Sequence, residues 1–166
     1  MTLSGGVMMK YELDNVVISF EDIYKGLPKR LDELISAPKY EIKSLTEGTI
    51  KKVFGEDSLP IEGVFLISNN TNNKMLYVGR SRNLATRIGV DLRATSREQA
   101  TISYKLTTLK DDYPDLETIR DAREYMYKHY SVQMIKVPDE NERAIFQIYA
   151  AMKLGTINVF NSFRET

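Results

Sequence analysis

Two short apolar runs, residues 63–68 and 74–78, flank the asparagine-rich stretch 69–73. Asparagine tolerates left-handed backbone conformations, and its side chain bonds its own main chain, so this stretch has the chemistry of a tight turn. Apolar runs joined by such a turn predict a β-hairpin. A chain built around this hairpin needs other elements to cover the faces of its sheet.

The rest of the chain supplies mainly amphipathic helices. Within residues 20–35 we expect two short helices, because Gly26-Leu27-Pro28 interrupts the apolar spacing. Residues 131–137 alternate as a strand should. Further helices are expected at 45–54, 81–93, 96–110, 115–129 and 139–154. This order of elements predicts an α+β fold, in which a small sheet is covered by helices.

Composition excludes several classes of site. The chain has no cysteine and one histidine, so disulfides, zinc–thiolate sites and thiol nucleophiles are excluded. No apolar run approaches the roughly 18 residues that a membrane-spanning helix needs. The N-terminus shows no basic region followed by a long apolar one. We therefore expect a cytoplasmic protein that has no membrane partner.

The charges are unevenly distributed along the chain. The net formal charge is zero, but residues 74–110 carry eight basic and two acidic side chains. That segment has a charge of +6, and the remainder therefore has −6. A basic segment on a neutral protein is compatible with binding a polyanion at one place. An ordinary solvated helix surface is the alternative that charge alone leaves open.

The basic segment includes the point where the second strand is expected to stop, at Gly79. We predict Ser81 as the N-cap of helix 81–93, so that Arg80, Arg82 and the first helical amides would point the same way. Amide donors and guanidinium groups both match the oxygens of a phosphate. A purely structural turn is the simpler alternative. The predicted substrate-binding residues are Gly79, Arg80, Ser81, Arg82 and, further along the chain, Lys105.

The same residues resemble a known motif. Gly63-Val64-Phe65, followed after eleven residues by Tyr77-Val78-Gly79, resembles the paired GIY and YIG strands of the GIY-YIG nuclease superfamily. The continuation Gly79-x-Ser81-x-Asn83-Leu84-x-x-Arg87-Ile88 is similar to the family's own continuation, and residues 100–106 and 147–156 are similar to segments of small bacterial members. The resemblance covers residues 60–166, which we predict to be a GIY-YIG-like nuclease domain. Residues 1–59 are then an N-terminal helical extension of unassigned role.

The resemblance implies both a fold and an activity. The fold is a three-stranded antiparallel sheet flanked by helices. The activity is hydrolysis of DNA phosphodiesters with one divalent cation, Mg²⁺ or Mn²⁺. In that chemistry a tyrosine activates or positions water, an arginine holds the scissile phosphate, and a glutamate on the last helix binds the metal. Clustering these groups is chemically sensible, because a phenol is a poor base unless a cation lowers its pKa.

The resemblance transfers these roles residue by residue. Tyr77 and Arg87 match the tyrosine and the arginine. Asn161 matches an asparagine that completes the site, and Asn158 is a second candidate for that position. Phe65 stands at the position of the first motif tyrosine and has no hydroxyl. Asp91 replaces an assisting histidine or tyrosine. Because it lies four residues after Arg87, it would share a helix face with Arg87.

Gln147 stands at the position of the metal-binding glutamate. A neutral amide can ligate through its oxygen, but it lacks the charge that draws a hard cation from water. One sequence leaves open whether Gln147 is natural or an engineered replacement, and whether Asp91 serves the metal or only pairs with Arg87. We expect Tyr77 and Arg87 to converge with Gln147 and Asn161 at the open edge of one concave surface.

The function implied by the resemblance is a metal-dependent DNA endonuclease, weakened by Gln147 and Phe65. The first alternative is a catalytically degraded relative that acts as a DNA- or protein-binding module. The second is a restructured domain that keeps the hairpin only as scaffold. No zinc finger or other recognisable DNA-reading module accompanies the hairpin in the sequence.

Overall fold

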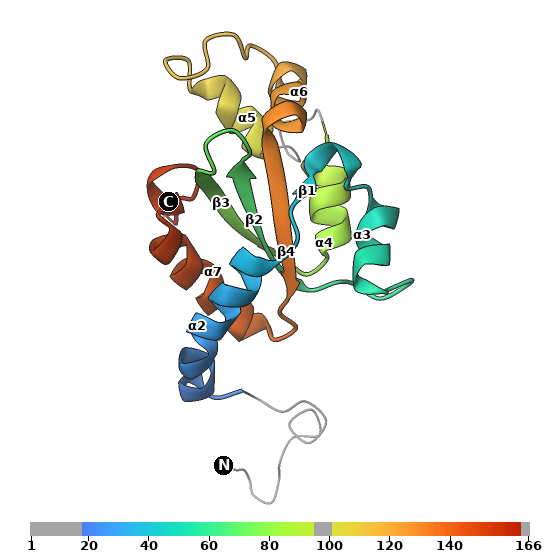
Figure 1. Cartoon of the computed structure of the whole chain (residues 1–166), viewed down its shortest axis with the longest axis vertical. Coiled ribbons are helices and arrows are strands. Elements are labelled where there is room, and N and C mark those ends of the chain that lie inside the picture. The colour runs from blue at the N-terminus through green and yellow to red at the C-terminus, as the bar shows by residue number, and fades with distance from the viewer. Residues whose placement is uncertain (1–17, 95–100, 164–166) are drawn as a thin grey trace, which may run out of the picture.

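The computed structural model describes residues 18–94 and 101–163, which are drawn in Figure 1. These residues form one antiparallel sheet with the strand order β1-β4-β2-β3. Its strands are β1 (Tyr40–Glu41), β2 (Gly63–Asn69), β3 (Met75–Ser81) and β4 (Tyr130–Lys136). The predicted α+β class is confirmed, but the expected count of three strands is wrong, because the described sheet has four.

The additional strand comes from the N-terminal part of the chain. Tyr40 and Glu41 pair with Val132 and Ser131 on the side of β4 that faces away from the hairpin. A strand of two residues is too short to show the alternation of polar and apolar side chains that marks a strand in a sequence. The sequence pattern therefore could not reveal it.

The hairpin between β2 and β3 is confirmed. The side-chain oxygens of Asn69 and Asn72 accept hydrogen bonds from the amides of Thr71 (2.8 Å) and Lys74 (2.9 Å). Asn73 adopts a left-handed conformation with φ of 57°. The asparagines thus close the turn through the side-chain bonds and backbone freedom for which they are suited.

Helices cover both faces of this sheet (Figure 1). They are α2 (Phe20–Ser36), α3 (Glu47–Phe54), α4 (Leu84–Thr86), α5 (Thr101–Thr108), α6 (Ile119–His129) and α7 (Glu140–Leu154). A π-helical segment, Arg87–Asp91, continues α4, and short 3₁₀ helices lie at Ile42–Ser44 and Thr156–Asn158. Among the residues described, no helix has the length and apolar composition to cross a membrane.

The two short helices expected within residues 20–35 are a single helix. Pro28 lies inside α2, where it removes one backbone donor from the helical ladder. The helix continues because Ile23, Leu27 and Leu34, which lie on both sides of the proline, are buried in one apolar cluster. Packing of this apolar face outweighs the local preference for a break.

Two apolar cores lie on the two faces of the sheet. Side chains of β2 alternate between them: Val64 and Leu66 join the cluster that also holds α2 and α7, which we call the α7-side core. Phe65 and Ile67 join the cluster that also holds α3, α4, α5 and α6, the α4-side core. The domain boundary at residues 59 and 60 stays a prediction, but both cores contain residues from either side of it.

Candidate functional site

Gly79 lies within β3, opposite Phe65 of β2, and not at the end of the strand as predicted. A Cβ atom built on Gly79 would overlap the Phe65 ring and lie 2.8 Å from Cε2 of Tyr77. Gly79 is not among the described residues with positive φ. The glycine is therefore explained by the close approach of the Phe65 ring, and not by backbone conformation.

The two motif strands place two aromatic rings side by side. The ring centroids of Phe65 and Tyr77 are 5.9 Å apart with an interplanar angle of 51°. Phe65 is fully buried, whereas Tyr77 is partly exposed and packs against the α4-side core. At the position of the first motif tyrosine, this chain thus has a core ring that supplies no polar group.

The turn after β3 lacks the amide array that we predicted for a phosphate. The N-cap of α4 is Asn83 and not Ser81, whose hydroxyl oxygen accepts a hydrogen bond from the Asn83 amide at 2.9 Å. The Ala85 amide donates to the Asn83 side chain at 3.2 Å, and the Leu84 amide donates to the Ile61 carbonyl at 2.8 Å. The first amides of this three-residue helix are already bonded within the chain.

Arg87 and Asp91 form an ion pair along the π-helical segment. Nη1 of Arg87 lies 4.0 Å from Oδ2 of Asp91, and the side chains are 20% and 26% exposed. Ile88, the next residue, is buried in the α4-side core, which places this segment on the same side of the sheet as Tyr77. The geometry agrees with the simpler hypothesis for Asp91, in which it pairs with Arg87.

Gln147 and Asn161 meet at one peptide of β3. Nε2 of Gln147 donates to the Val78 carbonyl oxygen at 3.0 Å, and Nδ2 of Asn161 donates to the same oxygen at 2.9 Å. The Val78 amide donates to Oδ1 of Asn161 at 2.8 Å, and the Thr156 hydroxyl donates to that same Oδ1 at 2.7 Å. All these bonds are buried.

These bonds close the outer edge of the sheet at this point. β3 is an edge strand, whose outward amides and carbonyls need partners. The Phe160 amide adds one more bond, to the Leu76 carbonyl at 3.2 Å. Gln147 and Asn161 therefore meet at the peptide after Tyr77, but the edge at which they meet is closed and not open, and the expected convergence of the Tyr77 and Arg87 side chains with them stays a prediction.

The residues at this edge do not fit a tightly held divalent cation. Gln147 is 8% exposed, is uncharged and has its amide nitrogen bonded to a backbone carbonyl. Hard cations such as Mg²⁺ prefer carboxylate oxygens. Within residues 18–94 and 101–163, no group of three or more His, Cys, Asp or Glu side chains has a metal-binding arrangement.

Arg80 lies on the other side of the sheet from Arg87. Side chains alternate along β3: Tyr77 packs against the α4-side core, and Val78 belongs to the α7-side core. Arg80, two residues after Val78, consequently lies toward α7, where it lines a pocket with Arg82. The prediction that these arginines and the α4 amides point the same way is wrong.

Other members of the basic segment stabilise the chain itself. Nζ of Lys105 donates to the Phe160 carbonyl at 3.1 Å and lies 5.9 Å from the centre of the Phe160 ring. Nη1 of Arg93 donates to the carbonyls of Ile42 (3.0 Å) and Lys43 (2.8 Å). The charge of the segment is thus divided between structural contacts and several parts of the surface.

One arginine near these residues was not predicted from the sequence. Arg143 of α7 is 3% exposed and lines the pocket that contains Arg80 and Arg82. It precedes Gln147 by four residues, so a helical wheel places both on one face. The same helix face carries the buried apolar residues Phe146 and Ala150. Two polar residues on an apolar face are the signal that could have identified Arg143.

Comparisons of the chain with protein-family models, with curated proteins and with solved structures found no match. The resemblance to GIY-YIG nucleases therefore depends on the motif residues alone and stays a prediction.

Proposed function

We propose that this chain is a GIY-YIG-related protein that binds the DNA backbone and cuts it slowly or not at all. The observation that carries the proposal is the hydrogen bond from Nε2 of Gln147 to the Val78 carbonyl oxygen. Gln147, at the family's metal position, binds the edge strand through its amide N–H, a donor that an ionised glutamate lacks. The hairpin and Arg87 are retained, whereas the charge needed for the metal is not.

Binding to DNA is supported by the arginines around the hairpin. Arg80 and Arg82 are exposed at the end of β3, and Arg87 is partly exposed on the other side of the sheet. Guanidinium groups form forked, charge-assisted hydrogen bonds with phosphate oxygens. A phosphate backbone that reaches either side of the hairpin would meet an arginine.

A second candidate is a metal-dependent endonuclease that uses a different carboxylate. It is favoured by the position of Asp91, whose Oδ2 lies 4.0 Å from Nη1 of Arg87. Under this hypothesis Asp91 would have to supply the charge that Gln147 lacks. Robust nicking by the unmodified chain that Asp91→Asn abolishes would favour this candidate over the first.

The salt dependence of DNA binding tests the proposal. Neutralising phosphates releases counterions, so the logarithm of the affinity should fall linearly with the logarithm of salt, by about 0.9 for each phosphate contact. For three contacts, the affinity should fall on the order of 40-fold between about 50 and 200 mM salt. Fluorescence anisotropy with a labelled duplex measures this. Equal affinity at low and high salt would contradict the proposal.

A further inference from the structure

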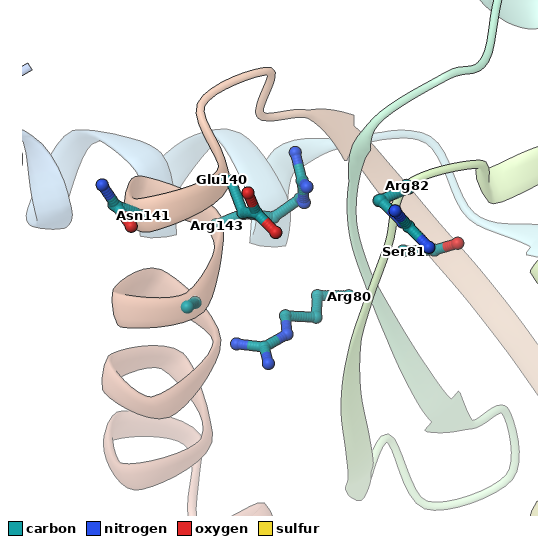
Figure 2. A pocket seen from close by; sticks show the side chains of 7 residues that line it. Arg80, Ser81, Arg82, Glu140, Asn141 and Arg143 are labelled. Carbon is teal, nitrogen blue, oxygen red and sulfur yellow. The ribbon is translucent and has the colours of Figure 1, made fainter. Parts of the chain in front are cut away.

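An arginine-lined pocket lies between the end of β3 and the start of α7 (Figure 2). Its volume is about 440 Å³, within the range of about 300–1,000 Å³ that small-molecule sites occupy. Strand β3 and the bend after it contribute Arg80, Ser81 and Arg82, and α7 contributes Glu140 and Arg143. Three guanidinium groups therefore share the pocket with one carboxylate.

Arg143 is held in place by the chain. Its Nη1 donates to the carbonyls of Val137 and Pro138, both at 3.1 Å, and lies 3.5 Å from Oε2 of Glu62. Every hydrogen bond that the described residues make with Arg143 uses Nη1. Nε and Nη2 remain as donors, and Figure 2 shows the side chain extending from α7 toward the bend after β3 that carries Arg82.

The two other arginines stand at the opening of the pocket. Arg80 and Arg82 are both exposed, and the Arg80 side chain extends from β3 toward α7 in Figure 2. Gathering three like charges is unfavourable unless anions join them, and the carboxylates of Glu140 and Glu62 leave one positive charge unbalanced. A buried, oriented guanidinium below two exposed ones is suited to an anion that enters from solvent.

From this arrangement, we infer that the pocket binds a phosphate group through Arg143, Arg80 and Arg82, on the side of the sheet away from Tyr77 and Arg87. Ser81 also lines this pocket, but its hydroxyl oxygen already accepts a hydrogen bond from the Asn83 amide at 2.9 Å, so the arginines provide the phosphate contacts. The phosphate is either a phosphodiester of DNA, in which case the inference extends the proposed function, or the phosphate of a nucleotide. The pocket adds a contact surface on α7 that the motif residues do not include.

The experiment compares two double variants of the full chain. Arg80→Gln with Arg82→Gln removes two charges at the pocket opening. Lys74→Gln with Lys110→Gln removes two exposed charges of the same basic segment that do not line this pocket. Probes are a labelled DNA duplex, thymidine 5′-monophosphate and inorganic phosphate. Arg143 is followed through its Nε–H signal by NMR, because replacing it would also remove its bonds to Val137 and Pro138.

If the pocket holds DNA phosphates, the Arg80/Arg82 variant should bind the duplex more weakly, with a salt slope reduced by about 2. The lysine variant should keep a slope close to that of the unmodified chain, and the duplex should shift the Arg143 signal. DNA binding that the arginine variant leaves unchanged would exclude DNA as the source of the phosphate and leave the proposed function standing; the inference would then require thymidine monophosphate to shift the Arg143 signal.

The nucleotide and phosphate probes separate the remaining outcomes. If the duplex does not bind but thymidine monophosphate shifts the Arg143 signal, the pocket is a nucleotide site, and the proposed DNA binding is wrong. If neither the duplex, the nucleotide nor inorganic phosphate moves that signal, the inference is overturned whatever the duplex does elsewhere.

Discussion

The amide nitrogen of Gln147 lies 3.0 Å from the carbonyl oxygen of Val78 and donates a hydrogen bond to it. Asn161 donates to the same oxygen at 2.9 Å, so two side-chain amides satisfy one peptide of an edge strand. The position that the resemblance assigns to a metal ligand is thereby occupied by a residue that stabilises the sheet.

We expect Gln147→Glu to lower the free energy of unfolding at pH 7 by about 1–3 kcal/mol, because an ionised carboxylate cannot donate to the Val78 carbonyl. Burial should raise the pKa of the introduced carboxyl above its ordinary value of about 4.3. A group with a raised folded-state pKa favours folding below its ordinary pKa, and this contribution is lost as pH rises through the folded-state pKa. The deficit of the variant should therefore shrink near pH 4.

Urea unfolding of Gln147→Glu at both pH values, beside the unmodified chain, measures this deficit. Gln147→Met is the matched control, since it removes the donor without adding a charge, and its deficit should not change with pH. A Gln147→Glu variant as stable as the unmodified chain at pH 7 would show that the amide nitrogen is not bonded to Val78.

Gly79→Ala should cost about 1–3 kcal/mol of stability, because its methyl group overlaps the Phe65 ring. Phe65→Leu removes the ring, so the double variant should lose less than the sum of the single changes. Gly48→Ala is the matched control: its Cβ meets nothing within 4 Å inside α3, so the change should stabilise the chain by about 0.4–1 kcal/mol. Thermal unfolding of all four variants measures these changes. A Gly79→Ala variant that loses no more stability than Gly48→Ala would contradict the close packing of Gly79 against the Phe65 ring.

If Arg87 contacts the scissile phosphate, Arg87→Ala should reduce the rate of any residual nicking on the order of 10²–10³-fold. The affinity for DNA should fall much less. Affinity should lose only one contact among several, with a salt slope reduced by about 1. Arg87→Lys keeps the charge but not the forked geometry, so it should restore affinity better than nicking. Complete loss of DNA binding in Arg87→Ala would show that Arg87 is the main anchor and not one contact of several.

The elements that could be predicted from the sequence are those specified by local chemistry. The asparagine-rich turn predicted the hairpin. Asp139 and Gly155 predicted the two ends of α7, and in the structure Asp139 caps the helix and Gly155 has a φ of 75°. The continuity of α2 through Pro28 could not be predicted, because burial of both halves against the sheet decides it.

The candidate site was predictable only in part, for a similar reason. The resemblance predicted that Tyr77, Arg87, Gln147 and Asn161 converge, and the structure places the two amides on the residue after Tyr77. What each amide bonds depends on which strand forms the edge of the sheet, and this is a property of tertiary structure. The separation of Arg80 from Arg87 likewise follows from β3 continuing past Gly79, which the glycine suggested it would not do.

The central claim is that this chain binds DNA without efficient metal-dependent cleavage. The most direct measurement follows a supercoiled plasmid in Mg²⁺ and in Mn²⁺ at a protein concentration that anisotropy shows to be saturating under the same conditions. We predict that the plasmid is bound and stays supercoiled, with nicking slow or undetectable. Rapid nicking that Tyr77→Phe and Arg87→Ala both abolish would contradict the claim and show that the site is an active nuclease despite Gln147.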